Sequence, residues 1–172
     1  LVEGFTINGY TPLYIGERIN SVQNEYSDNY SVIKDCNMII GEMKDTKSEL
    51  AKQLLGTAWA IRSICYYNLL IRFCEPYNPI SAEDKLGLPL IDRFDMEAKP
   101  SRSDLKTTVS FIEEGFKNAI RYDISDTDYI FTSDVAKAYL TKLYFWTQQW
   151  EKAIQYAEEL LSKYPMLEAN QY

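Results

Sequence analysis

Residues 48–73 read SELAKQLLGTAWAIRSICYYNLLIRF, and this stretch decides the fold class of the chain. One apolar stripe recurs every three or four residues, at Leu50, Leu54, Ala58, Ile61, Cys65 and Leu69. A second stripe follows at Tyr66, Leu70 and Phe73. Neighbouring elements bury a helix that is apolar on nearly all sides, so we expect this helix to lie at the centre of an all-α fold.

The same spacing predicts four further helices, at about residues 25–43, 103–121, 134–147 and 150–163. Ser101 with Asp104 resembles a capping box for the third helix along the chain. Ser133 or Asp134 is the expected N-cap of the fourth, and Pro165 stops the fifth. No alternating β pattern of useful length competes with these helices. A chain of 172 residues fits one domain, which we assign to residues 1–172.

Two segments interrupt the helical pattern. Residues 1–24, with three glycines and a proline, predict an irregular N-terminal segment. Residues 75–103 contain four prolines and predict a long loop. A connection of this length is uncommon in a compact domain. It is either an insertion with a binding or docking role or a crossover loop packed by its own apolar residues, Leu86, Leu88, Leu90 and Ile91.

The composition narrows the possible functions. The chain has no histidine, and 25 acidic against 18 basic residues give a net charge of -7. A Ser-His-Asp or Cys-His catalytic pair is therefore excluded. The acidic balance disfavours nucleic acid, which is bound through Lys and Arg on phosphates. The sequence predicts a binding protein that is not an enzyme and needs no cofactor.

Other candidate sites are weaker. Cys36, Cys65 and Cys74 have no paired spacing, which favours buried free thiols over a disulfide framework or zinc site. The acidic segment from Asp123 to Asp134 fits no frame of a calcium-binding EF-hand loop, so no metal site is predicted. The adjacent pairs of glutamates at 113–114 and 158–159 lie beside apolar stripes, as solvated surface charges do, and not as a glycosidase pair.

The 14 tyrosines are the strongest signal for ligand binding. Aromatic rings stack on sugar faces and bring a hydrogen-bonding group with them. Tyrosines at helical spacing are expected in the core: Tyr26, Tyr30, Tyr66, Tyr139 and Tyr156. Tyr10, Tyr14 and Tyr77 lie in irregular segments, and the first two have Arg18 and Asn20 nearby. We therefore take Tyr10, Tyr14, Arg18, Asn20 and Tyr77 as candidate ligand-binding residues.

Several motifs then resemble a known family. Residues 150–165, WEKAIQYAEELLSKYP, look like the second helix of a tetratricopeptide repeat. Residues 56–69 resemble the EA-x-FLRA-x-YYF-x-L helix of the SusD/RagB family, although Thr57 and Ser63 depart from it. Residues 30–37 are similar to its Y-x-x-I-x-x-x-N motif, residues 88–90 to its VPL, and residues 100–103 to its R-x-S. Together the motifs cover residues 26–165 in the family's order.

The resemblance implies a tetratricopeptide-like helical fold in which Arg62 and Asn37 are structural partners. It implies a surface-exposed lipoprotein of the Bacteroidetes outer membrane, whose only membrane contact is a lipidated N-terminal cysteine that this chain does not contain. Such proteins bind oligosaccharides or other nutrients above a SusC-like TonB-dependent transporter in polysaccharide uptake. This chain would be mainly their N-terminal part. The alternative is a tetratricopeptide-like protein-docking scaffold without a small-molecule ligand.

Overall fold

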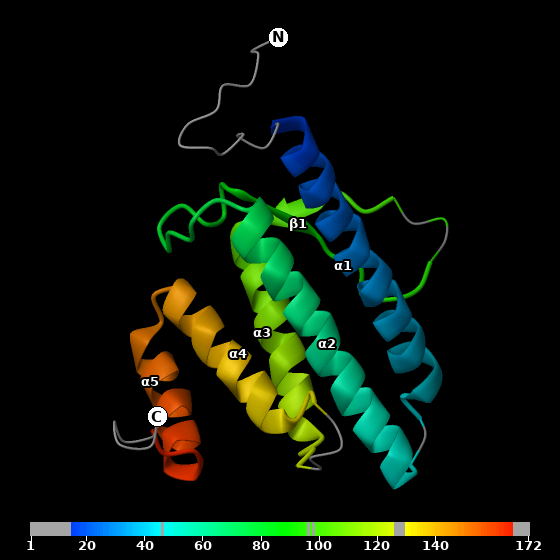
Figure 1. Cartoon of the computed structure of the whole chain (residues 1–172), viewed down its shortest axis with the longest axis vertical. Coiled ribbons are helices and arrows are strands. Elements are labelled where there is room, and N and C mark those ends of the chain that lie inside the picture. The colour runs from blue at the N-terminus through cyan, green and yellow to red at the C-terminus, as the bar shows by residue number, and fades with distance from the viewer. Residues whose placement is uncertain (1–14, 46, 96, 98, 126–129, 167–172) are drawn as a thin grey trace, which may run out of the picture.

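The computed structural model describes residues 15–45, 47–95, 97, 99–125 and 130–166, with the side chains of the first helix described from residue 24 onward. This part of the chain contains five helices, namely α1 (Ile15–Met43), α2 (Glu49–Phe73), α3 (Leu105–Arg121), α4 (Ser133–Trp146) and α5 (Trp150–Lys163). Two short strands, β1 (Leu86–Pro89) and β2 (Arg102–Asp104), form an antiparallel pair (Figure 1). The predicted all-α class is confirmed.

Each helix packs against the next one along the chain, so the helices stand side by side from α1 at one edge to α5 at the other (Figure 1). The α2 helix is central, because it contacts α1, α3, α4 and β1. This arrangement of consecutive helical hairpins is tetratricopeptide-like. One member of the predicted stripes is exposed: Leu50, in the first turn of α2, is 58% exposed, whereas Leu54, Ile61 and Phe73 are half-buried.

The core lies between α2, α3 and α4. Its largest fully buried side chains are Tyr66, Tyr144, Phe116, Ile33, Leu55, Leu69, Leu70, Leu88, Leu105, Ile112, Leu140 and Leu143. Aromatic rings meet edge to face within it, as for Tyr66 and Phe111, whose centroids lie 5.1 Å apart. The tyrosines expected in the core are buried or packed against it, which confirms that prediction.

Three predicted helix starts are corrected. The α1 helix begins at Ile15, so residues 15–24 are helical and not irregular. Asp104 alone is the N-cap of α3, because its carboxylate accepts a 2.7 Å hydrogen bond from the Thr107 amide, and Ser101 has no part in the cap. Thr132, and not Ser133 or Asp134, caps α4 through the Val135 amide. In α3 and α4 the cap is the residue with extended backbone before the first helical turn.

The long connection between α2 and α3 is largely ordered against the helices. The β1 and β2 strands within it pair Leu86 with Asp104 and Pro89 with Arg102. Arg102 also donates a 2.7 Å hydrogen bond from Nε to the Gly87 carbonyl, and Ser103 Oγ donates to the Leu88 carbonyl at 2.9 Å. The VPL-like and R-x-S-like motifs therefore meet in space and hold the middle of the connection against its C-terminal end.

Candidate functional site

A buried polar cluster joins α1, α2 and the connection. Arg62 and Asn37 are only 3% and 2% exposed. The guanidinium Nη1 donates to Asn37 Oδ1 at 2.6 Å, and Asn37 Nδ2 donates to the Ile91 carbonyl at 2.9 Å. The guanidinium carbon also lies 4.1 Å from the centre of the Trp59 ring, at cation-π distance. The prediction that Arg62 and Asn37 are structural partners is confirmed.

Two tyrosine hydroxyls, one on α1 and one on α2, bind the backbone of the connection near Ile91. The Ile91 amide donates to Tyr66 Oη at 2.8 Å, and Tyr30 Oη donates to the Pro89 carbonyl at 2.9 Å. Burial raises the pKa of Tyr66 to about 12, so this hydroxyl stays protonated at neutral pH. Residues 89–92 are therefore fixed on the surface of α1 and α2, and they position the residues that follow.

A cleft of about 440 Å³ lies beside this fixed segment, and we call it the Phe94 cleft. The Phe94 side chain is 46% exposed and forms part of its wall. Polar and charged groups surround the ring, so the cleft offers an aromatic face together with hydrogen-bond donors and acceptors. Its lining consists of Asn37, Met38, Ile40, Gly41, Glu42, Lys44, Asp92, Arg93 and Phe94.

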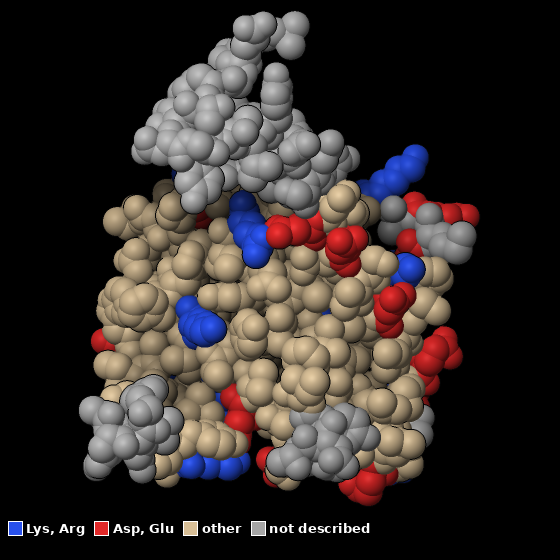
Figure 2. All heavy atoms as spheres, viewed as in Figure 1, with Lys and Arg blue, Asp and Glu red and all other residues tan. Residues whose placement is uncertain are grey.

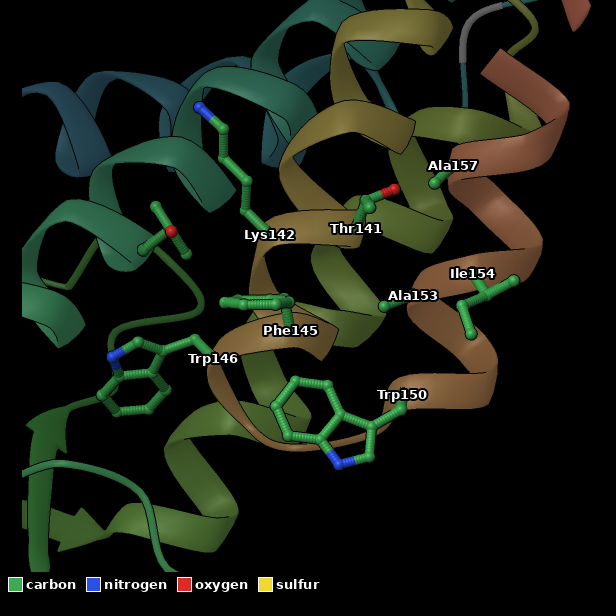
Figure 3. A pocket seen from close by; sticks show the side chains of 9 residues that line it. Thr141, Lys142, Phe145, Trp146, Trp150, Ala153, Ile154 and Ala157 are labelled. Carbon is green, nitrogen blue, oxygen red and sulfur yellow. The ribbon is translucent and has the colours of Figure 1, made fainter. Parts of the chain in front are cut away.

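A second hollow, of about 480 Å³, lies between α4 and α5, and we call it the aromatic groove. Figure 3 shows the side chains of Phe145 and Trp150 projecting beside each other from the two helices. Their ring centroids are 5.2 Å apart in an edge-on arrangement. The groove is almost entirely apolar and is lined by Tyr67, Thr141, Lys142, Phe145, Trp146, Trp150, Ala153, Ile154 and Ala157.

The candidate ligand residues from the sequence are only partly placed. Tyr10 and Tyr14 lie outside the described residues. Arg18 and Asn20 lie in the first turns of α1, where the structure describes the backbone but not the side chains. Tyr77 is half-buried, and its ring centroid lies 6.0 Å from that of Trp146, at the margin of the aromatic groove.

Sequence reasoning missed both hollows. Phe94 could have been predicted as a site residue, since it is an aromatic residue among charged neighbours in a loop. Trp150 could not, because its place on the apolar stripe of α5 predicts a core residue, yet its side chain is 47% exposed. Within the described residues, no three Cys, Asp or Glu side chains are grouped closely enough to hold a metal ion.

The comparisons with known proteins identify the family. The SusD-like_3 family, described as "Starch-binding associating with outer membrane", matches residues 8–145. The chain belongs to this SusD-like family. No curated protein matches the chain in sequence. Within the described residues, every helix is too short or too polar to span a bilayer.

Solved structures share the fold. A SusD-like carbohydrate binding protein from Bacteroides vulgatus has a TM-score of 0.72 at 22% identity, over 86% of this chain and 33% of its own. A SusD superfamily protein from Bacteroides thetaiotaomicron has a TM-score of 0.71 at 23% identity, over 79% of this chain and 31% of its own. A laminarin binding SusD-like protein has a TM-score of 0.64 at 21% identity, over 80% of this chain and 29% of its own. The chain thus spans about a third of the length of these relatives.

Proposed function

We propose that this chain is the N-terminal helical part of a surface glycan-binding protein that captures oligosaccharides for a SusC-like TonB-dependent transporter. The protein would be exposed at the outer-membrane surface and held there by a lipid anchor. The match of residues 8–145 to a starch-binding, outer-membrane-associating family carries this proposal. The absence of histidine from the whole chain supports binding without catalysis.

Among the described surfaces, the Phe94 cleft offers the chemistry that a saccharide needs. The half-exposed Phe94 ring provides an apolar face on which a pyranose can stack. Glu42, Lys44 and Asp92 line the same cleft and provide charged partners for sugar hydroxyls. The buried Asn37–Arg62 pair fixes the backbone next to the ring, which lowers the entropy cost of ordering the site.

The residues chosen from the sequence remain a second proposed set. In this arrangement an extended sugar lies on Tyr10 and Tyr14, with Arg18 and Asn20 hydrogen-bonding its hydroxyls. Tyr77 would contribute a further ring beside Trp146. One titration series tests both sets.

The experiment is calorimetric titration of the chain with a panel of α- and β-glucan, xylan and mannan oligosaccharides. We expect a member of the panel to bind and Phe94→Ala to weaken it about tenfold, the loss of one stacked ring. Ile80→Ala removes an exposed apolar side chain elsewhere and is the matched control. If Phe94→Ala leaves affinity unchanged while Tyr10→Ala and Tyr14→Ala abolish it, the N-terminal set is the site. If neither the chain nor its longer gene product binds any glycan, the proposed function is wrong.

The aromatic groove favours a second candidate function, that of a protein-docking scaffold. Its lining is nearly all apolar, and an apolar groove suits a protein segment better than a polyhydroxylated sugar. Stable pull-down of the transporter by a chain that binds no glycan would support this alternative.

A further inference from the structure

The Phe94 cleft meets a second hollow along the connection between α2 and α3. This hollow has a volume of about 280 Å³, and Asp92 and Arg93 line both it and the Phe94 cleft. Leu90 and Pro100 contribute apolar surface to its wall. Pockets that bind small ligands usually measure about 300–1,000 Å³, so the second hollow alone is small, whereas the two together have room for more than one sugar ring.

Asp92 lies where the two hollows meet, and hydrogen bonds fix its place in the chain. Its backbone carbonyl accepts a 3.4 Å hydrogen bond from Arg62 Nη1, and the preceding residue, Ile91, is held through both its amide and its carbonyl. Among the described residues the Asp92 carboxylate forms no ion pair, whereas its neighbour Arg93 lies 3.7 Å from Asp95. An ionised carboxylate accepts several hydrogen bonds through its two oxygens, so Asp92 can accept sugar hydroxyls from both hollows.

The charges around the two hollows are more negative than positive. Three carboxylates line them, those of Glu42, Asp92 and Asp95, against the two cations of Lys44 and Arg93. The whole chain has a net charge of -7, and Figure 2 shows acidic side chains gathered toward the right edge of the view, where α1 and the connection lie in Figure 1. A ligand that itself carries carboxylates would bring like charges together, which weakens binding and slows the encounter.

We propose that the Phe94 cleft and the second hollow together bind a neutral oligosaccharide of more than one sugar residue, and that they select it against glycans that contain uronic acids. One sugar ring stacks on Phe94, the next lies against Leu90 and Pro100, and Asp92 accepts hydroxyl hydrogen bonds from both. This inference rests on the proposed function, to which it adds the charge and the minimum length of the ligand.

The test is calorimetric titration of the 172-residue chain with glucan and mannan tetraoses and with their monosaccharides. The best-binding tetraose is then oxidised at C6 to the uronate and compared with the methyl ester of that uronate, which has the same rings and linkages but no charge. We expect the neutral tetraose to bind at least about tenfold more tightly than its monosaccharide. The methyl ester should bind at least about tenfold more tightly than the acid.

Asp92→Asn tests the carboxylate at the junction. Asp28→Asn is the matched control, because it removes the same charge from an exposed position on α1 that lines neither hollow. We expect Asp92→Asn to weaken binding of the neutral tetraose about fivefold, since hydrogen bonds to a neutral amide are weaker than those to a carboxylate. It should also narrow the preference for the ester over the acid about fivefold, while Asp28→Asn changes neither quantity.

Three results would overturn the inference and leave glycan capture in place. They are an acid that binds as tightly as its methyl ester, a tetraose that binds no more tightly than its monosaccharide, and an Asp92→Asn variant that behaves like Asp28→Asn. If no tetraose binds, the inference fails as well, and the wider glycan panel with the longer gene product then decides the proposed function separately.

Discussion

Asn37 and Arg62 meet side chain to side chain in the core, with the guanidinium Nη1 2.6 Å from the amide Oδ1. The pair joins α1 to α2, and the Asn37 amide also donates a hydrogen bond to the Ile91 carbonyl, which ties the segment between α2 and α3 to the pair. Burial lowers the pKa of Arg62, yet guanidinium remains charged in proteins. A buried charge of this kind needs its hydrogen bonds to be complete.

Replacing Asn37 should therefore destabilise the fold. Asn37→Ala removes the acceptor from a buried guanidinium and the donor from the Ile91 carbonyl, so we expect a loss of about 2–3 kcal/mol in the free energy of unfolding. Urea unfolding followed by circular dichroism measures it. Asn24→Ala, at an exposed position on the same helix, should change stability by less than about 0.5 kcal/mol. An equal effect of the two variants would contradict the structural role of the pair.

Two glycines should respond in opposite directions to alanine. A Cβ at Gly87 would lie 2.0 Å from Thr108 Oγ1 and 2.5 Å from the Asp104 carbonyl oxygen, at the β1–β2 pairing. Gly87→Ala should cost about 2–3 kcal/mol, because backbone and a bonded hydroxyl have to move. A Cβ at Gly41, inside α1, meets nothing within 4 Å. Gly41→Ala should stabilise by up to about 1 kcal/mol, and thermal unfolding of both variants checks the difference in sign.

The fold could be predicted from the sequence because its helices are amphipathic or fully apolar over many turns. The bounds of α5 were predicted to the residue, and α2 starts one residue after the predicted Ser48. The start of α1 was missed although Ile15, Ile19 and Val22 continue the apolar spacing of its later turns, because the glycines and the proline of residues 1–24 favoured an irregular segment. The strands were missed as well, since a three-residue and a four-residue strand held by Arg102 and Ser103 leave no alternating pattern.

The candidate site was less predictable for a physical reason. Apolar spacing identifies the face of a helix but does not say whether another element covers that face. Trp150 and Ile154 therefore looked like core residues, although they are exposed on α5. Phe94 becomes part of a cleft only because residues 89–92 are tied to α1 and α2 by hydrogen bonds between residues far apart in sequence.

The three thiols should differ in reactivity. Burial raises the pKa of Cys36 to about 11 and that of Cys65 to about 12, and both side chains are buried. Cys74 is only partly buried, although burial raises its pKa as well. Because the thiolate is the reactive form, a disulfide reagent at pH 8 should modify Cys74 first. The other two should react only after unfolding in denaturant. Rapid modification of all three in the native chain would contradict the packing of α1 on α2.

Glu113 should make stability depend on acid pH. Its carboxylate accepts hydrogen bonds from Lys117 Nζ at 2.6 Å and Tyr144 Oη at 2.9 Å. Burial by itself would raise the pKa of Glu113, but these two hydrogen bonds, together with the positive charges of Lys117 and Lys152, outweigh it and lower the pKa. Because its pKa is lowered in the folded state, Glu113 contributes fully to the stability of the fold above the ordinary carboxyl pKa of about 4.3. This contribution is lost as the pH falls through the pKa of Glu113 in the folded state.

Glu113→Gln should therefore lower the free energy of unfolding by about 1–2 kcal/mol at pH 7. The difference in this free energy between the variant and the wild type should narrow toward pH 3. Glu114→Gln is the matched control, because the neighbouring carboxylate is more than half exposed and lies 3.4 Å from Arg121. That exposed pair should contribute less than about 0.5 kcal/mol at any pH. Denaturant unfolding of the three proteins between pH 3 and pH 7 gives the comparison. A gap for Glu113→Gln that is as large at pH 3 as at pH 7 would show that the side chain acts by packing and not through its charge.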